Sequence, residues 1–155
     1  MERSLAPFLV EARRRTYAAE GDDAAVRPLL PGFHQLEYGD QSLLYRDVYV
    51  GGAFFVGQET VYADGAPHWS MSYAGGVESE VVEKEAIRAI YAFLREALRG
   101  VSERHLFRGP PVFGLGSFRY QSGAEGGLER FHGEERISLD GRTVYTLHFQ
   151  GGALR

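Results

Sequence analysis

The stretch FVGQETVYADGAPHWSMSYAGG, residues 55–76, has an echo in FHGEERISLDGRTVYTLHFQGG, residues 131–152. The two segments align without a gap at an offset of 76, and seven of the 22 positions are identical. Similar segments also precede them, since FLVEA at 8–12 resembles FLREA at 93–97. The pattern predicts one domain, residues 1–155, made of two pseudo-repeats at about 4–76 and 79–152.

Hydrophobic periodicity indicates the order helix, strands, helix, strands. Apolar residues recur at helical spacing over 4–19 and 79–98, and they alternate with polar residues in the strand segments between 34 and 74 and after 117. Residues 20–32 and 102–116 have no clear period and read as loops. We therefore expect an α+β fold, in which two helices pack on one face of a curved antiparallel sheet of six to eight strands.

The hairpin at the centre of each repeat carries a glutamate toward the core. In the second copy Phe131, Glu135 and Leu139 lie in one row, and a three-residue loop, 139–141, brings this row opposite the apolar row of the next strand. The same rule in the first copy uses 63–65. It places Glu59 opposite Trp69, and Glu135 opposite Tyr145.

A buried carboxylate must find a partner, and two interpretations are open. Each glutamate could be satisfied internally by a tyrosine, the tryptophan or an arginine, and so only stabilise the repeat. Alternatively, one or both could line a cavity and bind a cation or act as a general acid or base. Asp47 shares a face with Tyr45 and Tyr49, and it is either a solvated strand residue or part of such a site.

Composition excludes several classes of function. The chain of 155 residues has a net charge of −4 and no cysteine, which excludes disulfides and thiolate metal sites. The basic run Arg13, Arg14 and Arg15 reads as the solvated side of a helix, so we expect no nucleic-acid binding by this chain alone. No apolar segment is long enough to span a membrane, and we expect a cytoplasmic protein. His132 and His148, with Glu134 nearby, are interpreted as an incidental surface group, and no metal or cofactor is expected.

The motifs HQLEY, YRDVYVGG, GQETVY, PHWSMSYAGG and RGPP, read together, resemble a bacterial and archaeal family of unknown function. Some members of that family follow a Cro/C1-type helix-turn-helix, so the resemblance implies a sensor or a module associated with transcription regulation. Asp47, Glu59, Trp69 and Tyr73 match the family pattern, whereas the chain departs from it at Gln35, Gln58 and Ser72, among others. The arrangement of helices and strands also resembles, more loosely, the gyrase-inhibitor-like effector-binding domains, which implies a pocket for aromatic cations.

These observations favour binding of a small cationic or aromatic ligand without chemistry. The expected site lies between the two copies, with Glu59 and Glu135 as anchors, Asp47 nearby, and an aromatic wall formed by Trp69, Tyr45, Tyr73 and Tyr145. One alternative is a hydrolase with Glu59 or Asp47 as general base. Another is a protein-interaction module with structural glutamates, in which Phe54, Val56 and Tyr62 form the contact of a homodimer.

Overall fold

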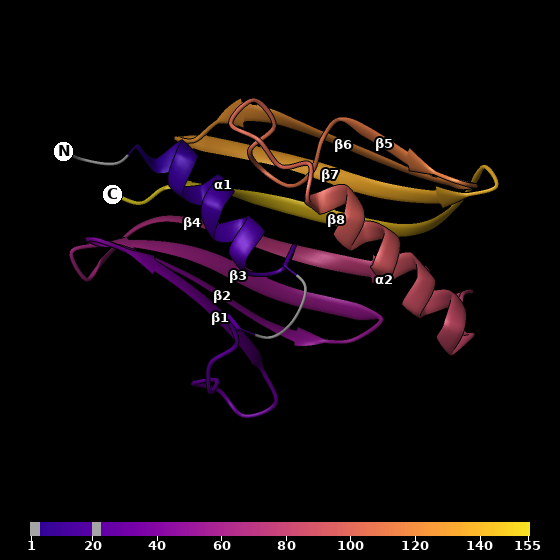
Figure 1. The fold of residues 1–155 in the computed structure, drawn as a ribbon, viewed down its shortest axis with the longest axis horizontal. Helices are drawn as coiled ribbons and strands as arrows, with labels where there is room; N and C mark the ends of the chain where they lie inside the picture. Colours follow the sequence, from indigo (N-terminus) through magenta and orange to yellow (C-terminus); the bar gives the residue numbers. More distant parts are fainter. Residues whose placement is uncertain (1–3, 20–22) are drawn as a thin grey trace.

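Eight antiparallel strands form a single curved sheet, with two short helices on its inner face (Figure 1). The computed structural model describes residues 4–19 and 23–155. The elements follow one another as α1 (Leu5–Arg15), β1 (His34–Asp40), β2 (Leu43–Gly51), β3 (Phe54–Ala63), β4 (Ala66–Val77), α2 (Lys84–Leu98), β5 (Val112–Leu115), β6 (Phe118–Gly127), β7 (Arg130–Leu139) and β8 (Arg142–Ala153).

The predicted α+β class is wrong. Strands account for 52% of the chain and helices for only 17%, so the fold is a curved β-sheet with a minor helical part. Both helices are shorter than predicted. In particular, α2 begins at Lys84, because residues 78–81 form a turn that is closed by the Val81 N–H donating to the Glu78 carbonyl at 3.0 Å. The strand β5 lies within the stretch predicted to be a loop.

The strand order is β1-β2-β3-β4-β8-β7-β6-β5, so that from either edge four strands follow one another in chain order toward the middle of the sheet. We call α1 with β1–β4 the first half and α2 with β5–β8 the second half. The halves join where β4 pairs with β8, and Tyr73 lies directly opposite Phe149 at the centre of that pairing. Asp47 is paired with Glu59 in the first half, and Ser122 takes the same place beside Glu135 in the second half.

The central hairpins differ from the prediction in their turns. Each has a two-residue turn, Asp64-Gly65 or Asp140-Gly141, in which both residues have positive φ. This backbone matches the right-handed twist of paired strands, and an Asp-Gly sequence suits it. A bulge follows each turn and shifts the register by one residue. The predicted three-residue loops are therefore wrong, and Glu59 lies opposite Met71 while Glu135 lies opposite Leu147.

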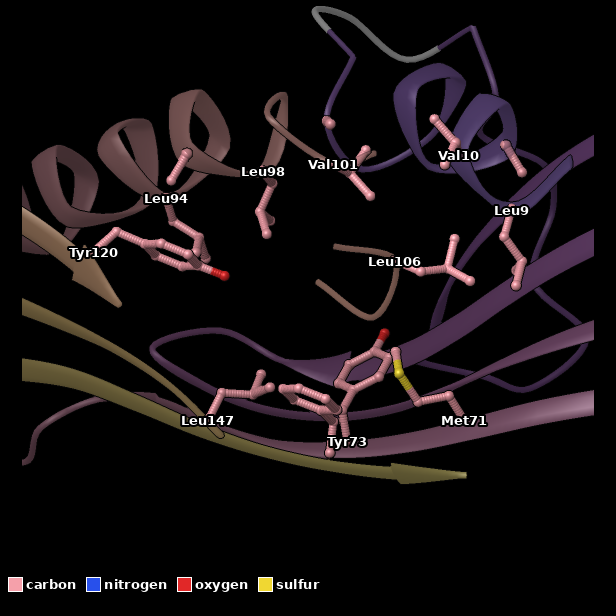
Figure 2. Close-up of a cluster of buried hydrophobic side chains, with 14 of the residues drawn as sticks. Leu9, Val10, Met71, Tyr73, Leu94, Leu98, Val101, Leu106, Tyr120 and Leu147 are labelled. Atoms are coloured by element: carbon pink, nitrogen blue, oxygen red, sulfur yellow. The ribbon is translucent and has the colours of Figure 1, made fainter. Parts of the chain in front are cut away.

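The bulges keep the predicted rows on the inner face of the sheet. Glu59, Trp69, Glu135 and Tyr145 are all fully buried, which confirms the direction in which they point. The core lies between these rows and the helices. In Figure 2, Leu98 of α2 points toward the sheet, from which Tyr73 and Leu147 rise, while Met71 lies below Leu106. On the outer face Phe54 and Val56 are exposed.

Candidate functional site

Glu59 forms a fully buried ion pair with Arg13. Arg13 projects from α1, and its Nε and Nη2 donate to the Glu59 Oε2 at 3.1 and 2.7 Å. Its Nη1 donates to the Leu106 carbonyl, which belongs to the second half. Burial lowers the pKa of Arg13, but the charge and hydrogen bond of Glu59, together with Tyr17 and Tyr45, raise it above its ordinary value. The sequence interpretation of Arg13 as a solvated residue is wrong, whereas Arg14 and Arg15 are exposed.

Glu135 has three donors. The Arg108 Nη2 donates to its Oε1 at 2.7 Å, the Tyr145 hydroxyl donates to the same oxygen at 2.8 Å, and the Tyr120 hydroxyl donates to Oε2 at 2.6 Å. Arg108 comes from the segment between α2 and β5 and is also buried. Both oxygens of this carboxylate are therefore satisfied within the protein, and Tyr145 is one of its hydrogen-bond donors.

Asp47 is buried without an ion pair among the described residues. Its Oδ1 accepts a hydrogen bond from the Tyr73 hydroxyl at 2.6 Å. Burial and the negative charge of the neighbouring Glu59 raise the pKa of Asp47 to about 7, although the bond from Tyr73 and the charges of Arg108 and Arg13 act in the opposite direction. At neutral pH this carboxyl can therefore either donate or accept a proton.

A cavity of about 450 Å³ opens above Asp47, between α2, the end of α1 and the inner face of the sheet. Its walls include five aromatic rings, and Arg95 and Arg108 each contribute a cation. Of the seven residues predicted for the site, Asp47 and Tyr73 line the cavity, and Glu59, Glu135, Trp69, Tyr145 and Tyr45 do not. The residues that line it are Thr16, Tyr17, Ala19, Leu36, Asp47, Tyr49, Gly52, Phe55, Tyr73, Tyr91, Leu94, Arg95, Leu98 and Arg108. Two larger hollows, of about 690 and 750 Å³, have none of the three buried carboxylates in their walls.

The other two predicted wall residues are part of the packed interior. The Trp69 indole N–H donates to the Leu128 carbonyl at 3.1 Å, and its ring stacks on Phe131 with 5.6 Å between centroids. Tyr45 is fully buried, and its hydroxyl has no hydrogen-bond partner in the part of the chain that the structure describes. Trp69 therefore joins the two halves, while Tyr45 is left with an unsatisfied polar atom.

A family model described as "Domain of unknown function (DUF5680)" matches residues 47–154. The chain belongs to this family. No curated protein and no solved structure matches it. The part that matches DUF5680 includes Asp47, Tyr73, Tyr91 and Arg108 of the cavity, whereas Tyr17 precedes it.

Most residues that line the cavity of this DUF5680 chain were not predicted as site residues. Tyr17 lies near the end of the predicted helix 4–19, and Arg108 lies in the stretch 102–116, which has no period, so no pattern directed either side chain toward a site. Tyr91 was assigned to the apolar stripe of its helix and Phe55 to the inward row of its strand. The sequence did indicate that two buried glutamates need partners such as arginines. It could not show which arginines these are, so Arg108 was not identified.

On the outer face, His132 and His148 are not directly opposite each other. His148 lies opposite Glu134, with 3.4 Å between its Nδ1 and the Glu134 Oε2, and His132 lies opposite Gln150. Both histidines are exposed. Within residues 4–19 and 23–155, no group of three or more potential ligand side chains could hold a metal ion. In the same part of the chain, no helix has the length and apolar character needed to cross a membrane.

Proposed function

We propose that the chain binds a small aromatic cation, without chemistry, in the cavity above Asp47. A cavity of about 450 Å³ falls within the range of small-molecule sites, which are mostly apolar with a few placed polar groups. The observation that carries the proposal is the buried Asp47, which is held by Tyr73 and surrounded by the rings of Tyr49, Phe55 and Tyr91.

The distribution of charge favours a cation as the ligand. Glu59 is neutralised by Arg13, and Glu135 by Arg108. Asp47 is the buried carboxyl without such a partner among the described residues. A bound ammonium group would supply the missing charge and favour the ionised form of Asp47, while the ring faces would attract the same cation. In this proposal Asp47 takes the anchoring role that the sequence suggested for the two glutamates.

A sensor role would suit such a site. The resemblance to proteins that follow a Cro/C1-type helix-turn-helix implies a bacterial or archaeal regulatory context, in which a small-molecule signal changes the state of an attached domain. The rings around the cavity come from both halves, since Tyr91 belongs to α2 and Tyr49 to β2. A ligand between them would therefore stabilise the contact of the two halves.

An enzyme is the second candidate, and one observation favours it. A carboxyl whose pKa is raised to about 7 is well suited to general acid–base catalysis at neutral pH. In this case Asp47 would act as the base of a hydrolase. The two candidates differ in outcome, because only the enzyme would consume a compound that occupies the cavity.

The test uses phenethylamine, which joins a benzene ring to an ammonium group. Binding is measured by isothermal titration calorimetry and by NMR shifts of the protein. We expect Asp47→Asn to weaken binding about tenfold or more, because it removes a charge-assisted hydrogen bond. Ser122→Ala is the matched control, since Ser122 has the equivalent place beside Glu135, and it should leave the affinity unchanged. Equal affinities of wild type and Asp47→Asn, or no binding at all, would rule out the proposal.

A further inference from the structure

Four buried polar atoms lack a hydrogen-bond partner among the described residues, and they belong to neighbouring groups. They are the hydroxyls of Tyr17 and Tyr45, the Oε1 of Glu59 and the Nε of Arg108. An unsatisfied buried polar atom costs on the order of 1–3 kcal/mol, so four of them at one place need an explanation.

Two of the four groups belong to the wall of the cavity, and the other two, Glu59 and Tyr45, are fully buried and lie outside it. Tyr17 and Arg108 belong to this wall, and the Arg108 Cζ lies 5.2 Å from the centre of the Tyr17 ring. Burial raises the pKa of Tyr17, and the charges of Glu59 and Arg108 also act on its hydroxyl. Burial likewise raises the pKa of Tyr45, on which Glu59 acts most strongly among the charges. Since Glu59 is paired in register with Asp47, these atoms lie next to the proposed anchor of the ligand.

In the second half, the tyrosine and the glutamate at the equivalent positions have hydrogen-bond partners. Tyr120 is paired with Ile137 as Tyr45 is with Val61, two residues from the glutamate in each case. The Tyr120 hydroxyl donates to Glu135 at 2.6 Å and also accepts from the Gly109 N–H at 3.1 Å. Tyr145 supplies another donor to Glu135, whereas the first half has Trp69 in that place, and the indole donates to Leu128 instead. Both carboxylate oxygens of Glu135 therefore accept hydrogen bonds, whereas the Oε1 of Glu59 has no donor among the described residues.

The four unpaired atoms call for a chemical group that can both donate and accept hydrogen bonds. Arg108 Nε can only donate, Glu59 Oε1 can only accept, and a tyrosine hydroxyl can do either. The two arginines and the two glutamates around them cancel in charge. A neutral group that both donates and accepts hydrogen bonds can donate to the Glu59 Oε1 and accept from the Arg108 Nε, whereas an ion would disturb the balance of charge. Hydroxyl and carboxamide groups have this property.

We infer that Tyr17, Tyr45, Glu59 and Arg108 form a polar subsite, which takes a hydroxyl or carboxamide group next to the cationic centre of the ligand. The inference rests on the proposed function and specifies the class of ligand as an aromatic amine with a neutral polar substituent. Access passes Tyr17, which follows α1 in a turn and whose hydroxyl is held by no hydrogen bond from the described residues. In this proposal, rotation of the Tyr17 side chain would connect the subsite with the cavity.

The test compares phenethylamine with phenylalaninol and phenylalaninamide, which add a hydroxymethyl or a carboxamide group beside the amine. In the wild-type protein we expect both to bind about tenfold more tightly than phenethylamine, because they form additional buried hydrogen bonds. Tyr45→Phe should abolish this advantage and leave the affinity for phenethylamine unchanged. Tyr120→Phe is the matched control, because Tyr120 is the equivalent of Tyr45 in the second half and lies outside the subsite. It should preserve the advantage.

The outcomes separate this inference from the proposed function. If phenethylamine binds in a manner that depends on Asp47, but the added groups bring no advantage, then the subsite is wrong and the proposed function stands. An advantage that survives Tyr45→Phe also overturns the subsite. If none of the three compounds binds, both proposals fail. A crystal structure of the phenylalaninol complex provides the direct check, since the hydroxyl must lie within hydrogen-bond distance of Tyr45 or Glu59.

Discussion

Asp47, Glu59 and Glu135 all lie on the inner face of the sheet, yet their neighbours give them different properties. Glu59 and Glu135 each have an arginine at 2.7 Å, which compensates the charge that burial would otherwise penalise. Asp47 has a tyrosine hydroxyl and lies beside the negative charge of Glu59. Asp47 can therefore change its protonation state near neutral pH, and it lies in the wall of a cavity.

Replacement of Asp47 by asparagine should change how stability depends on pH. Burial and Glu59 raise the pKa of Asp47 from 3.8 to about 7, so the folded protein retains a proton that the unfolded chain releases between these values. The free energy of unfolding of the wild type should therefore decrease as the pH rises through this range. An asparagine side chain at this position has no proton to lose and still accepts a hydrogen bond from Tyr73. We expect Asp47→Asn to be more stable than wild type by about 2 kcal/mol or more at pH 8.

Urea unfolding from pH 4 to pH 8 measures this difference. The advantage of Asp47→Asn should shrink toward the acidic end, because Asp47 of the wild type is then protonated in both states. A difference that stays constant over the whole range would show that Asp47 is already ionised in the folded protein, and would contradict the raised pKa.

At the scale of the elements, alternation in the sequence was sufficient to predict most strands and the faces they bury. The rows that contain Trp69 and Tyr145 point inward as expected. The turns were mispredicted because a two-residue turn with a bulge and a three-residue loop bury the same rows, so the alternation cannot distinguish them. The edge strand β5 was missed because its four residues are too few to show a period.

The turns themselves can be tested with a pair of glycines. Gly141 has a φ of 79°, and the space around its Cα is open, so alanine there meets backbone strain without a steric clash. We expect Gly141→Ala to lower the free energy of unfolding by about 1 kcal/mol. Gly127 also has open space around it but is not among the residues with positive φ, and Gly127→Ala should have little effect. Chemical denaturation of both variants gives the comparison, and equal effects would contradict the assigned turn.

At the scale of the whole molecule, the sequence could not show which distant segments meet. The two helical patterns suggested an α+β protein, but the helices are shorter than their patterns and strands dominate the chain. The cavity also depends on residues that are far apart in the chain, since Arg108 lies over the rings of both Tyr17 and Tyr73. The demand of two buried glutamates for cations was visible in the sequence, whereas the choice of Arg13 and Arg108 follows from the packing of the halves.

The halves are coupled strongly enough that we predict a single unfolding transition. Nine residue pairs join β4 to β8, and Trp69 of the first half stacks on Phe131 of the second. Arg108, from the second half, lies over the ring of Tyr73 at 5.7 Å and neutralises Glu135. Arg108→Met leaves Glu135 buried without a cation and should cost about 3–5 kcal/mol. Because the halves unfold together, this loss should appear equally in a probe of either one.

Trp69 is the single tryptophan of the chain and stacks on Phe131, so its fluorescence reports on the contact between the two halves, while far-UV circular dichroism reports on the entire sheet. In the wild type both signals should change at the same urea concentration, and Arg108→Met should lower both midpoints by the same amount. The exposed neighbour Arg104 supplies the control, because Arg104→Met should change stability by no more than about 0.5 kcal/mol. If Arg108→Met shifts the circular dichroism but leaves the Trp69 transition in place, the chain does not unfold in a single transition and the predicted coupling of the halves is wrong.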